Sequence, residues 1–450
     1  MKFFQRYAVP EAAQQMSNWD LFATWLGANA NNGTWYIGGV IAACGLVTAS
    51  SLLIVTGCCA YLLLMCVSLA GYQTKLPTMT LMRGAFGIRG SIIPSLINIV
   101  QFIGWTAVNT YIAALSVSYI FQELFHWSKN QHWGIIIGII IMSILHLLSI
   151  SLGERSVRLI ERFGMILVTI FVIWESIVVL KMVPFSDLLV WRPSGHFRLP
   201  SGIAIDSLAA FNLAWVTAAA DFSRYARHQK AATWASFWGA NLGLIWFALM
   251  GIIATIASAI LLGKFDPNNS DPSTVAAQLG LGVLALIVIM LTSTTANAVN
   301  LMAAGSAATN IFSKLPLKPA LWIVTIAAAV VTFIPVYVTT FLETFKWFLD
   351  AIGMFLGPEV AIFLVDYFLI HHSHYAIDEF DQPTGPYWYF HGWHLPALGS
   401  WILGVGIYLG LKQVAGINQT VGATFITILI TAAIYYAWRS WTVSRISRAE

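Results

Sequence analysis

Charge is what this sequence has least of. Only 9% of its 450 residues are Asp, Glu, Lys or Arg, whereas 58% are hydrophobic. A water-soluble domain carries about 25% charged residues, so this composition excludes a water-exposed surface. The mean hydropathy is +0.76, and apolar runs long enough to cross a bilayer as helices recur along the whole chain. The sequence therefore predicts an all-α polytopic membrane protein.

Cysteine is also scarce. The four cysteines, Cys44, Cys58, Cys59 and Cys66, lie in or beside the first two apolar runs. None has the CxxC spacing of a redox or metal motif, and buried cysteines in apolar surroundings are usually packing residues. They predict neither a disulfide nor a metal site.

Twelve membrane spans account for the apolar runs. Their predicted ranges are 21–44, 48–70, 87–120, 132–153, 158–180, 203–220, 235–262, 275–304, 321–338, 339–370, 396–411 and 421–437. With both termini in the cytoplasm, 16 of the 23 Lys and Arg residues fall in cytoplasmic segments. Cytoplasmic loops of membrane proteins carry such an excess, so the charge pattern supports this topology in a plasma (bacterial inner) membrane. The net charge of +4 then reflects topology and predicts no nucleic-acid partner.

The stretch WLGANANNGTWYIGG, residues 25–39, interrupts the first span. Its Asn and Gly residues disfavour a continuous helix, because Gly costs about 1 kcal/mol and Asn competes for its own backbone. A broken helix in a membrane persists where protein or a water-filled cavity covers it. Its free carbonyls can then bind a cation and its ends can face a substrate, which makes Asn31 a candidate. The alternative is a close helix–helix contact.

The third span carries Gln101, Trp105 and Asn109 at four-residue spacing, which places them on one helix face. A large ring between two amides suits a flat heterocycle: the ring stacks, and the amides donate to and accept from the edge of the ligand. The alternative is an interfacial tryptophan, but Trp105 lies in the middle of its span.

Polar residues also gather in two later spans. The eighth contains TSTTANAVN, residues 292–300, whose hydroxyl oxygens suit an alkali cation. The alternative for any single Thr is a hydroxyl bonded back to the carbonyl four residues earlier. The sixth places Asn212 and Trp215 in its middle and Asp221 near its cytoplasmic end. Asp221 beside Arg224 and Arg227 predicts an ion pair or a gate.

Few other ionisable residues lie near the spans. Glu175 is a candidate for proton coupling, since charges within a membrane are costly and tend to be functional. Asp366 and Glu154 are expected at solvated helix ends. The HHSH run, residues 371–374, resembles a metal cluster only in composition.

Several motifs together resemble the nucleobase:cation symporter-1 family. They are WLGANANNGTWYIGG, RGAFGIRGSIIPSL, GWTAVNTYI, ADFSRYAR, TSTTANAVN and GPEVAIFLVDYFL, in order between about Trp19 and Trp393. GTWYIGG and ADFSRYAR favour the cytosine-permease and hydroxymethylpyrimidine-transporter branches. The resemblance implies a LeuT-type fold: inverted repeats at 19–200 and 201–371, two further helices at 372–438, and cytoplasmic segments at 1–18 and 439–450.

The resemblance also implies roles for individual residues. Trp105 matches the family's stacking tryptophan and Asn109 its amide reader, while Asn297 and Asn300 match positions that contact substrate. A sodium ion would bind at Gly27, Ala30, Thr294 and Thr295. This sequence departs from relatives where it has Asn212 in place of an aromatic residue, so Trp215 or Phe211 is expected to substitute. The sixth span also lacks a Gly or Pro at its expected break.

These features predict a secondary active transporter, not an enzyme. It would import a planar nitrogen heterocycle such as cytosine, a purine base or hydroxymethylpyrimidine, together with Na⁺ or H⁺ and without a cofactor. The rival functions are an amino-acid carrier of the same fold, a membrane metalloenzyme and a passive channel. The sequence carries no signal for an oligomeric state.

Overall fold

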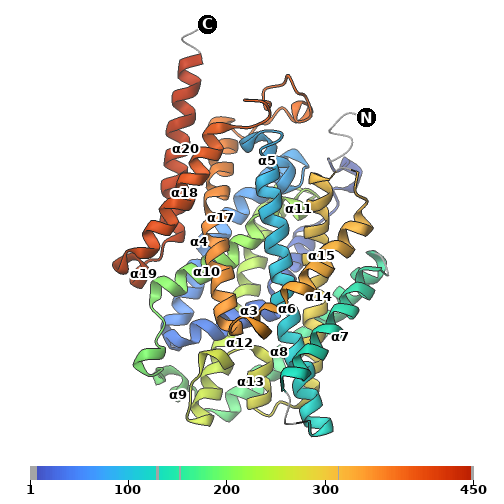
Figure 1. Ribbon diagram of the computed structural model, residues 1–450, viewed down its shortest axis with the longest axis vertical. Coiled ribbons are helices and arrows are strands. Elements are labelled where there is room, and N and C mark those ends of the chain that lie inside the picture. The colour runs from blue at the N-terminus through green and yellow to red at the C-terminus, as the bar shows by residue number, and fades with distance from the viewer. Residues whose placement is uncertain (1–7, 128–130, 152–153, 313, 447–450) are drawn as a thin grey trace.

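The computed structural model describes residues 8–127, 131–151, 154–312 and 314–446, and within these ranges the chain is a bundle of helices (Figure 1). The helices of the first half are α2 (Asn18–Asn29), α3 (Asn32–Ile41), α4 (Leu46–Thr74), α5 (Thr78–Phe86), α6 (Ile92–Phe125), α7 (Gln131–Ser151), α8 (Glu154–Met182) and α9 (Phe185–Val190). Those of the second half are α10 (Ser201–Val216), α11 (Ala219–Ser223), α12 (Ser236–Leu262), α13 (Pro272–Gln278), α14 (Gly282–Ile311), α15 (Leu317–Val331), α16 (Ile334–Tyr337), α17 (Phe341–Leu364), α18 (Leu395–Gln413), α19 (Ala415–Thr420) and α20 (Thr424–Ile446). Nine helical segments in the described ranges are long and apolar enough to cross a membrane.

The first predicted span is broken, as its sequence indicates. α2 ends at Asn29 and α3 begins at Asn32. Between them Asn31 is extended, with φ −140° and ψ 166°, and its side-chain oxygen accepts a hydrogen bond from the Thr34 N–H at 3.0 Å. Asn31 thus caps the second half of the helix, which satisfies one of the N–H groups that the break exposes.

The sixth predicted span is broken too, without Gly or Pro. α10 ends at Val216, Ala218 has φ −113° and ψ 3°, and α11 starts at Ala219. At this point the Thr217 hydroxyl donates to the Asn98 side chain on α6 at 3.0 Å. A side-chain contact with a neighbouring helix therefore accompanies the break.

Two predicted helix starts are wrong. Gly87 does not begin the third span: it ends the separate short helix α5 with φ +91°, and α6 starts only at Ile92. The eighth span does not begin at Val275, because α13 ends at Gln278 and Gly280 and Gly282 turn the chain with φ +65° and +78°. Glycine reaches these angles without the steric cost that other residues meet.

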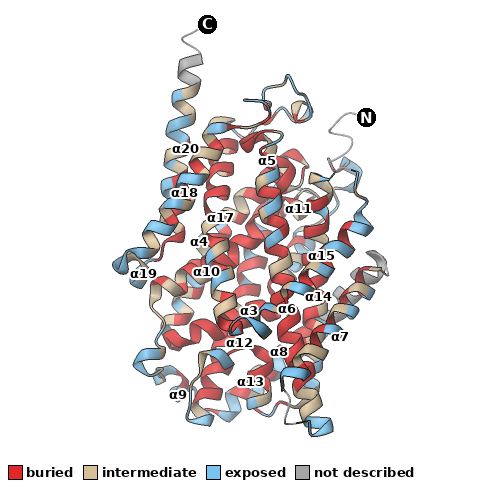
Figure 2. Cartoon of the chain, in the orientation of Figure 1, coloured by how far each residue is buried: buried red, intermediate tan, exposed pale blue. Residues whose placement is uncertain are grey.

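Figure 2 shows buried residues along the middle of the bundle and exposed ones on its periphery. α6 packs along α14 and α7, and α12 packs along both halves of the broken first helix. Many exposed side chains are large and apolar, among them Val55, Ile170, Ile323 and Leu429. Such a surface suits lipid rather than water.

The chain before α2 packs against segments predicted to be cytoplasmic. Lys75 pairs with Glu11 at 3.0 Å, and the backbone of Met16 is bonded to Tyr225 and Arg227. The N-terminal segment, the α4–α5 connection and the end of α11 therefore share one end of the bundle.

Candidate functional site

A cavity lies where both broken helices meet α6 and α14. It is lined by Asn31, Phe102, Trp105, Asn109, Phe211, Ala214, Trp215 and Asn300, and its free volume is about 10 Å³, about the room for one water. Ligand pockets are typically about 300–1,000 Å³, so the lining residues are packed together here and must separate to admit a ligand. Six predicted substrate-binding residues line it together: Asn31, Trp105, Asn109, Phe211, Trp215 and Asn300.

Aromatic rings hold Trp105 from two sides. Its indole meets Phe211 of α10 and Phe348 of α17 edge-on, with ring centroids 5.0 Å apart in each case, and Phe345 of α17 at 6.1 Å. Phe345 and Phe348 were not predicted for the site, although TFKWFLD has aromatic residues at helical spacing. Gly33 lies beside this cluster: a Cβ there would lie 3.6 Å from both Trp105 and Phe211 and only 3.0 Å from the Asn31 side-chain oxygen.

Trp105 and Asn109 each have one side-chain polar atom without a hydrogen-bond partner in the described protein. The Asn109 amide nitrogen donates to the Trp105 carbonyl at 3.2 Å. The Trp105 indole N–H and the Asn109 side-chain oxygen are buried and have no partner in the described protein. A buried polar atom without a partner costs about 1–3 kcal/mol. The site therefore offers one donor and one acceptor, spaced one helical turn apart, to a ligand with the complementary pair.

The asparagines of α14 face α6. The Asn297 amide nitrogen donates to the Thr106 carbonyl at 3.1 Å and lies 3.3 Å from His146 of α7. Asn300 lines the cavity and donates to the Asn297 oxygen at 3.4 Å. Asn297 is not a lining residue, so its contacts hold Asn300 and α6 in register. His146 is a part of this layer to which the sequence analysis gave no role.

Gln101 and Asn212 do not line the cavity. The Gln101 amide nitrogen donates to the Asn98 oxygen at 2.8 Å, to the Thr217 hydroxyl at 3.0 Å and to the Ala214 carbonyl at 3.2 Å. Gln101 thus ties α6 to the break of the sixth helix. Asn212 is fully buried, and neither polar atom of its side chain has a partner in the described part of the chain.

The four residues of the predicted sodium site lie on α14 and at the break of the first helix. The Gly27 carbonyl accepts from the Ala30 N–H at 3.1 Å. Thr294 and Thr295 donate their hydroxyl hydrogens to carbonyls of α14 at 3.0 and 2.9 Å, which leaves their oxygen lone pairs free. Asn32 links the two elements, since its amide nitrogen donates to the Ile289 carbonyl at 2.8 Å.

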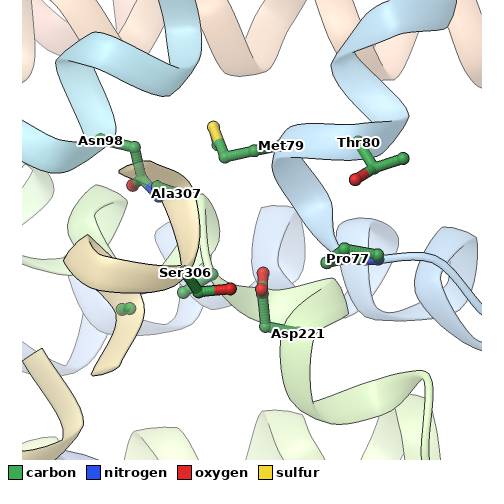
Figure 3. Close-up of a pocket in the computed structure, with 9 residues that line it drawn as sticks. Pro77, Met79, Thr80, Asn98, Asp221, Ser306 and Ala307 are labelled. Carbon is green, nitrogen blue, oxygen red and sulfur yellow. The ribbon is translucent and has the colours of Figure 1, made fainter. Parts of the chain in front are cut away.

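Asp221 was predicted to form an ion pair or a gate, and in the described part of the chain its carboxylate is bonded to Thr78 rather than to an arginine. Its carboxylate accepts from the N–H and the hydroxyl of Thr78, at 3.2 and 2.9 Å, and so caps α5. The free N–H groups of a helix start compete well for a carboxylate. Arg224 donates instead to the backbone carbonyl of Asp221 and to the Tyr225 hydroxyl. Asp221 also lines a separate cavity of about 30 Å³ with Asn98, Ser306 and others (Figure 3).

The expectation that Asp366 is solvated is also wrong. Asp366 is fully buried and accepts hydrogen bonds from Tyr375 at 2.6 Å and Tyr435 at 2.5 Å. His371, the first residue of HHSH, lies 3.2 Å from its carboxylate. These contacts fold the chain after α17 back onto α20. No group of three or more His, Cys, Asp or Glu in the described ranges is arranged to hold a metal. Glu154 lies in a stretch whose side chains are outside the described set.

Comparison with known proteins decides the family. A family model described as "Permease for cytosine/purines, uracil, thiamine, allantoin" matches residues 8–441. The chain belongs to this permease family. It is similar to a putative purine-cytosine permease, YxlA, of Bacillus subtilis, with 27% identity over 82% of this chain and 79% of the relative. It is also similar to a putative allantoin permease of Escherichia coli, with 23% identity over 97% of this chain and 95% of the relative.

Solved structures share the fold of this permease. The nucleobase-cation-symport-1 family transporter Mhp1, in a closed conformation with bromovinylhydantoin bound, matches with a TM-score of 0.78 at 18% identity, over 98% of this chain and 95% of that one. The predicted family and LeuT-type helical fold are therefore confirmed. The protein is an integral membrane transporter and not an enzyme.

Proposed function

We propose that this permease is a cation-coupled symporter that imports a small planar nitrogen heterocycle by alternating access. Cytosine, a purine base and hydroxymethylpyrimidine are the candidate substrates. One observation carries the proposal: the cavity at the two helix breaks is lined by Trp105 and Asn109, which present a buried N–H and a buried oxygen without protein partners.

Such a site selects its ligand in two ways. Stacking of a base on an aromatic side chain contributes about 1–3 kcal/mol and favours any flat ring. The donor and the acceptor then reject flat rings without the matching edge, because a wrong ligand leaves both groups buried and unpaired. Purine, cytosine and allantoin, named for the relatives, are nitrogen-rich. Cytosine and allantoin carry an N–H beside a C=O, and purine carries an N–H near a ring-nitrogen acceptor, so each offers a donor and an acceptor on one edge.

An amino acid fits the cavity less well. A carrier of this fold would use the free N–H groups at the start of α3 to hold the amino-acid carboxylate. In this chain the Thr34 N–H is already bonded to the Asn31 side chain. The lining contributes no charged side chain either.

Sodium is the coupling ion that we propose for the site at Gly27, Ala30, Thr294 and Thr295. Carbonyl and hydroxyl oxygens are the hard ligands that an alkali cation prefers. The free lone pairs of the two threonine hydroxyls support this assignment. Cation binding here would hold the first helix against α14 and so organise the substrate cavity.

We also propose two inverted repeats, at 19–200 and 201–371, in a plasma membrane with both termini in the cytoplasm. Each repeat then begins with a broken helix, α2 with α3 and α10 with α11. The packing of the N-terminal segment on the α4–α5 connection supports the shared side of these segments.

Thermal stabilisation of the purified protein tests the proposal. The panel contains cytosine, uracil, adenine, hypoxanthine, allantoin, hydroxymethylpyrimidine and leucine, each in sodium and in potassium buffer. A ligand at 100 times its dissociation constant stabilises by about 2.7 kcal/mol. We expect a shift with at least one heterocycle, larger in sodium, and none with leucine. A shift with leucine alone would overturn the substrate class, and equal shifts in both salts would overturn the sodium site.

A further inference from the structure

We propose that Glu175 of α8 is a second cation site, which binds a proton and is linked to substrate binding through the broken first helix. The linkage rests on the proposed symport function, whereas proton binding by Glu175 does not. The carboxyl lies outside the substrate cavity and outside the four residues of the proposed sodium site.

Glu175 borders a cavity of its own. The residue is 3% exposed and lines a small cavity of about 20 Å³ between α8, α3, α12 and α14. Val168, Phe171 and Phe247 form its apolar walls. Asn31 and Trp35, from the broken first helix, form another side. One carboxyl oxygen has no partner in the described protein, and the Trp35 side chain hydrogen-bonds the carboxyl.

The helices packed around Glu175 from other parts of the chain carry no Lys or Arg. α3, α7, α12, α13 and α14 contain no Lys or Arg. Their titratable groups are Tyr36 on α3, and His132 and His146 on α7, where His146 is bonded to Thr110 and Asn297. Asp271 caps α13 and adds a further acid rather than a base. The Lys and Arg residues of α8 lie at its two ends, at positions 155, 158, 162 and 181.

A proton is the cation that suits this environment. A buried carboxylate without a partner is costly in apolar surroundings, and uptake of one proton at the free oxygen removes the charge. A proton needs no cage of oxygens, whereas sodium needs several. Here Thr292 uses its hydroxyl hydrogen on the Val288 carbonyl, and Asn32 uses its amide on Ile289, so polar ligands are few.

The route to the substrate is short. Asn31 lines both the Glu175 cavity and the substrate cavity. Trp35, the partner of Glu175, donates its backbone N–H to the Asn31 carbonyl at 3.1 Å in the first turn of α3. Protonation changes the acceptor available to the Trp35 indole, and a shift of Trp35 moves the turn that carries Asn31. Substrate and proton therefore bias the same short segment, which is what linkage requires.

The test is the pH dependence of ligand affinity in the full-length protein. The dissociation constant of the panel heterocycle that stabilises the wild type most is measured between pH 5 and pH 9 at fixed sodium. We expect it to rise about tenfold per pH unit on the alkaline side, because one proton is bound with the ligand. Glu175→Gln, which imitates the protonated acid, is expected to bind with the low-pH affinity at every pH.

Glu359→Gln is the matched control. Glu359 is also fully buried and its carboxyl oxygens have no partner in the described protein, but it lies on α17 and lines neither cavity. We expect this variant to keep the wild-type pH dependence. Three results would overturn the proposal. The pH dependence of the dissociation constant could persist in Glu175→Gln, or it could be lost in Glu359→Gln. The wild-type affinity could also depend on sodium and not on pH.

A second measurement needs no ligand and separates the two proposals. Protonation of Glu175 in the folded state makes the wild-type unfolding temperature depend on pH in a way that Glu175→Gln removes. If no panel compound binds but this difference is present, the substrate class is wrong and the proton site stands. If the two pH profiles coincide, Glu175 binds no proton in this range. Should Glu175→Gln fail to fold, Trp35→Phe, which removes the N–H donor, is expected to shift the midpoint of both pH profiles.

Discussion

Replacement of Trp105 separates the two contributions that the site makes to binding. Trp105→Phe keeps an aromatic ring but removes the buried indole N–H. A neutral hydrogen bond contributes about 0.5–1.5 kcal/mol, so affinity should fall about 2- to 12-fold. Trp105→Ala also removes the stacking surface, which contributes about 1–3 kcal/mol. The combined loss of about 1.5–4.5 kcal/mol predicts affinity about 10- to 2,000-fold weaker and no measurable uptake.

The control accounts for lost packing. Trp105 contacts three phenylalanine rings, so its truncation also destabilises the fold. Trp401 of α18 stacks on Phe355 at 5.8 Å, and its indole N–H donates to the Phe355 carbonyl at 3.1 Å, away from the cavity. Trp401→Ala should lower the unfolding temperature without changing affinity.

Isothermal titration of each purified variant, with uptake by proteoliposomes, gives both quantities. A Trp105→Ala affinity within threefold of the wild type would refute the stacking role. A large loss in Trp105→Ala with none in Trp105→Phe would instead leave stacking intact and refute the role of the N–H.

Three further predictions concern neighbouring features. Gly33→Ala places a methyl group beside the ring cluster and 3.0 Å from the Asn31 oxygen that caps α3, so ligand affinity should fall. Stability should change little, because the helix preference for Ala, about 1 kcal/mol, opposes the crowding of that oxygen. Unchanged affinity would place the ligand elsewhere. Asp221→Ala removes the cap of α5 and should lower the free energy of unfolding, measured thermally, by about 0.5–2 kcal/mol. Ligand affinity should not change, and a loss of affinity of the same size would assign Asp221 to the substrate site. For His371, burial lowers the pKa, but the hydrogen bond and charge of Asp366 outweigh it and hold the pKa above its usual value. Its stabilisation is therefore complete below about pH 6.5 and lost as pH rises through the raised value, and His371→Gln should remove that part of the pH profile of the unfolding temperature.

Local patterns in the sequence predicted much of the site. The broken first helix was predictable because Asn and Gly act on their own backbone within a few residues. Trp105 and Asn109 were predictable as neighbours, since four-residue spacing fixes a common helix face. The partners of that face were not, because Phe345 and Phe348 come from a helix more than 200 positions later in the chain.

The errors have a common cause. Asp221 was assigned to the arginines beside it in the sequence, yet its carboxylate binds Thr78, 143 positions away. Asp366 was placed at a solvated helix end, yet the chain after α17 returns and buries it under Tyr375 and Tyr435. Gln101 was expected to read the ligand, but it lies against the break of the sixth helix.

The sequence by itself determined that this protein is a membrane permease with a polar break in its first helix and an aromatic–amide stripe in its third span. Composition sets the solvent that a chain can face, and helical spacing sets which residues share a face. Only the tertiary structure decided which polar groups are consumed by neighbours and which are left without a protein partner. In both Asn109 and Gln101 the amide nitrogen is engaged and the side-chain oxygen has no partner in the described protein, but only Asn109 lines the cavity. Contacts between distant segments make that distinction, because Gln101 is bound to the break of the sixth helix.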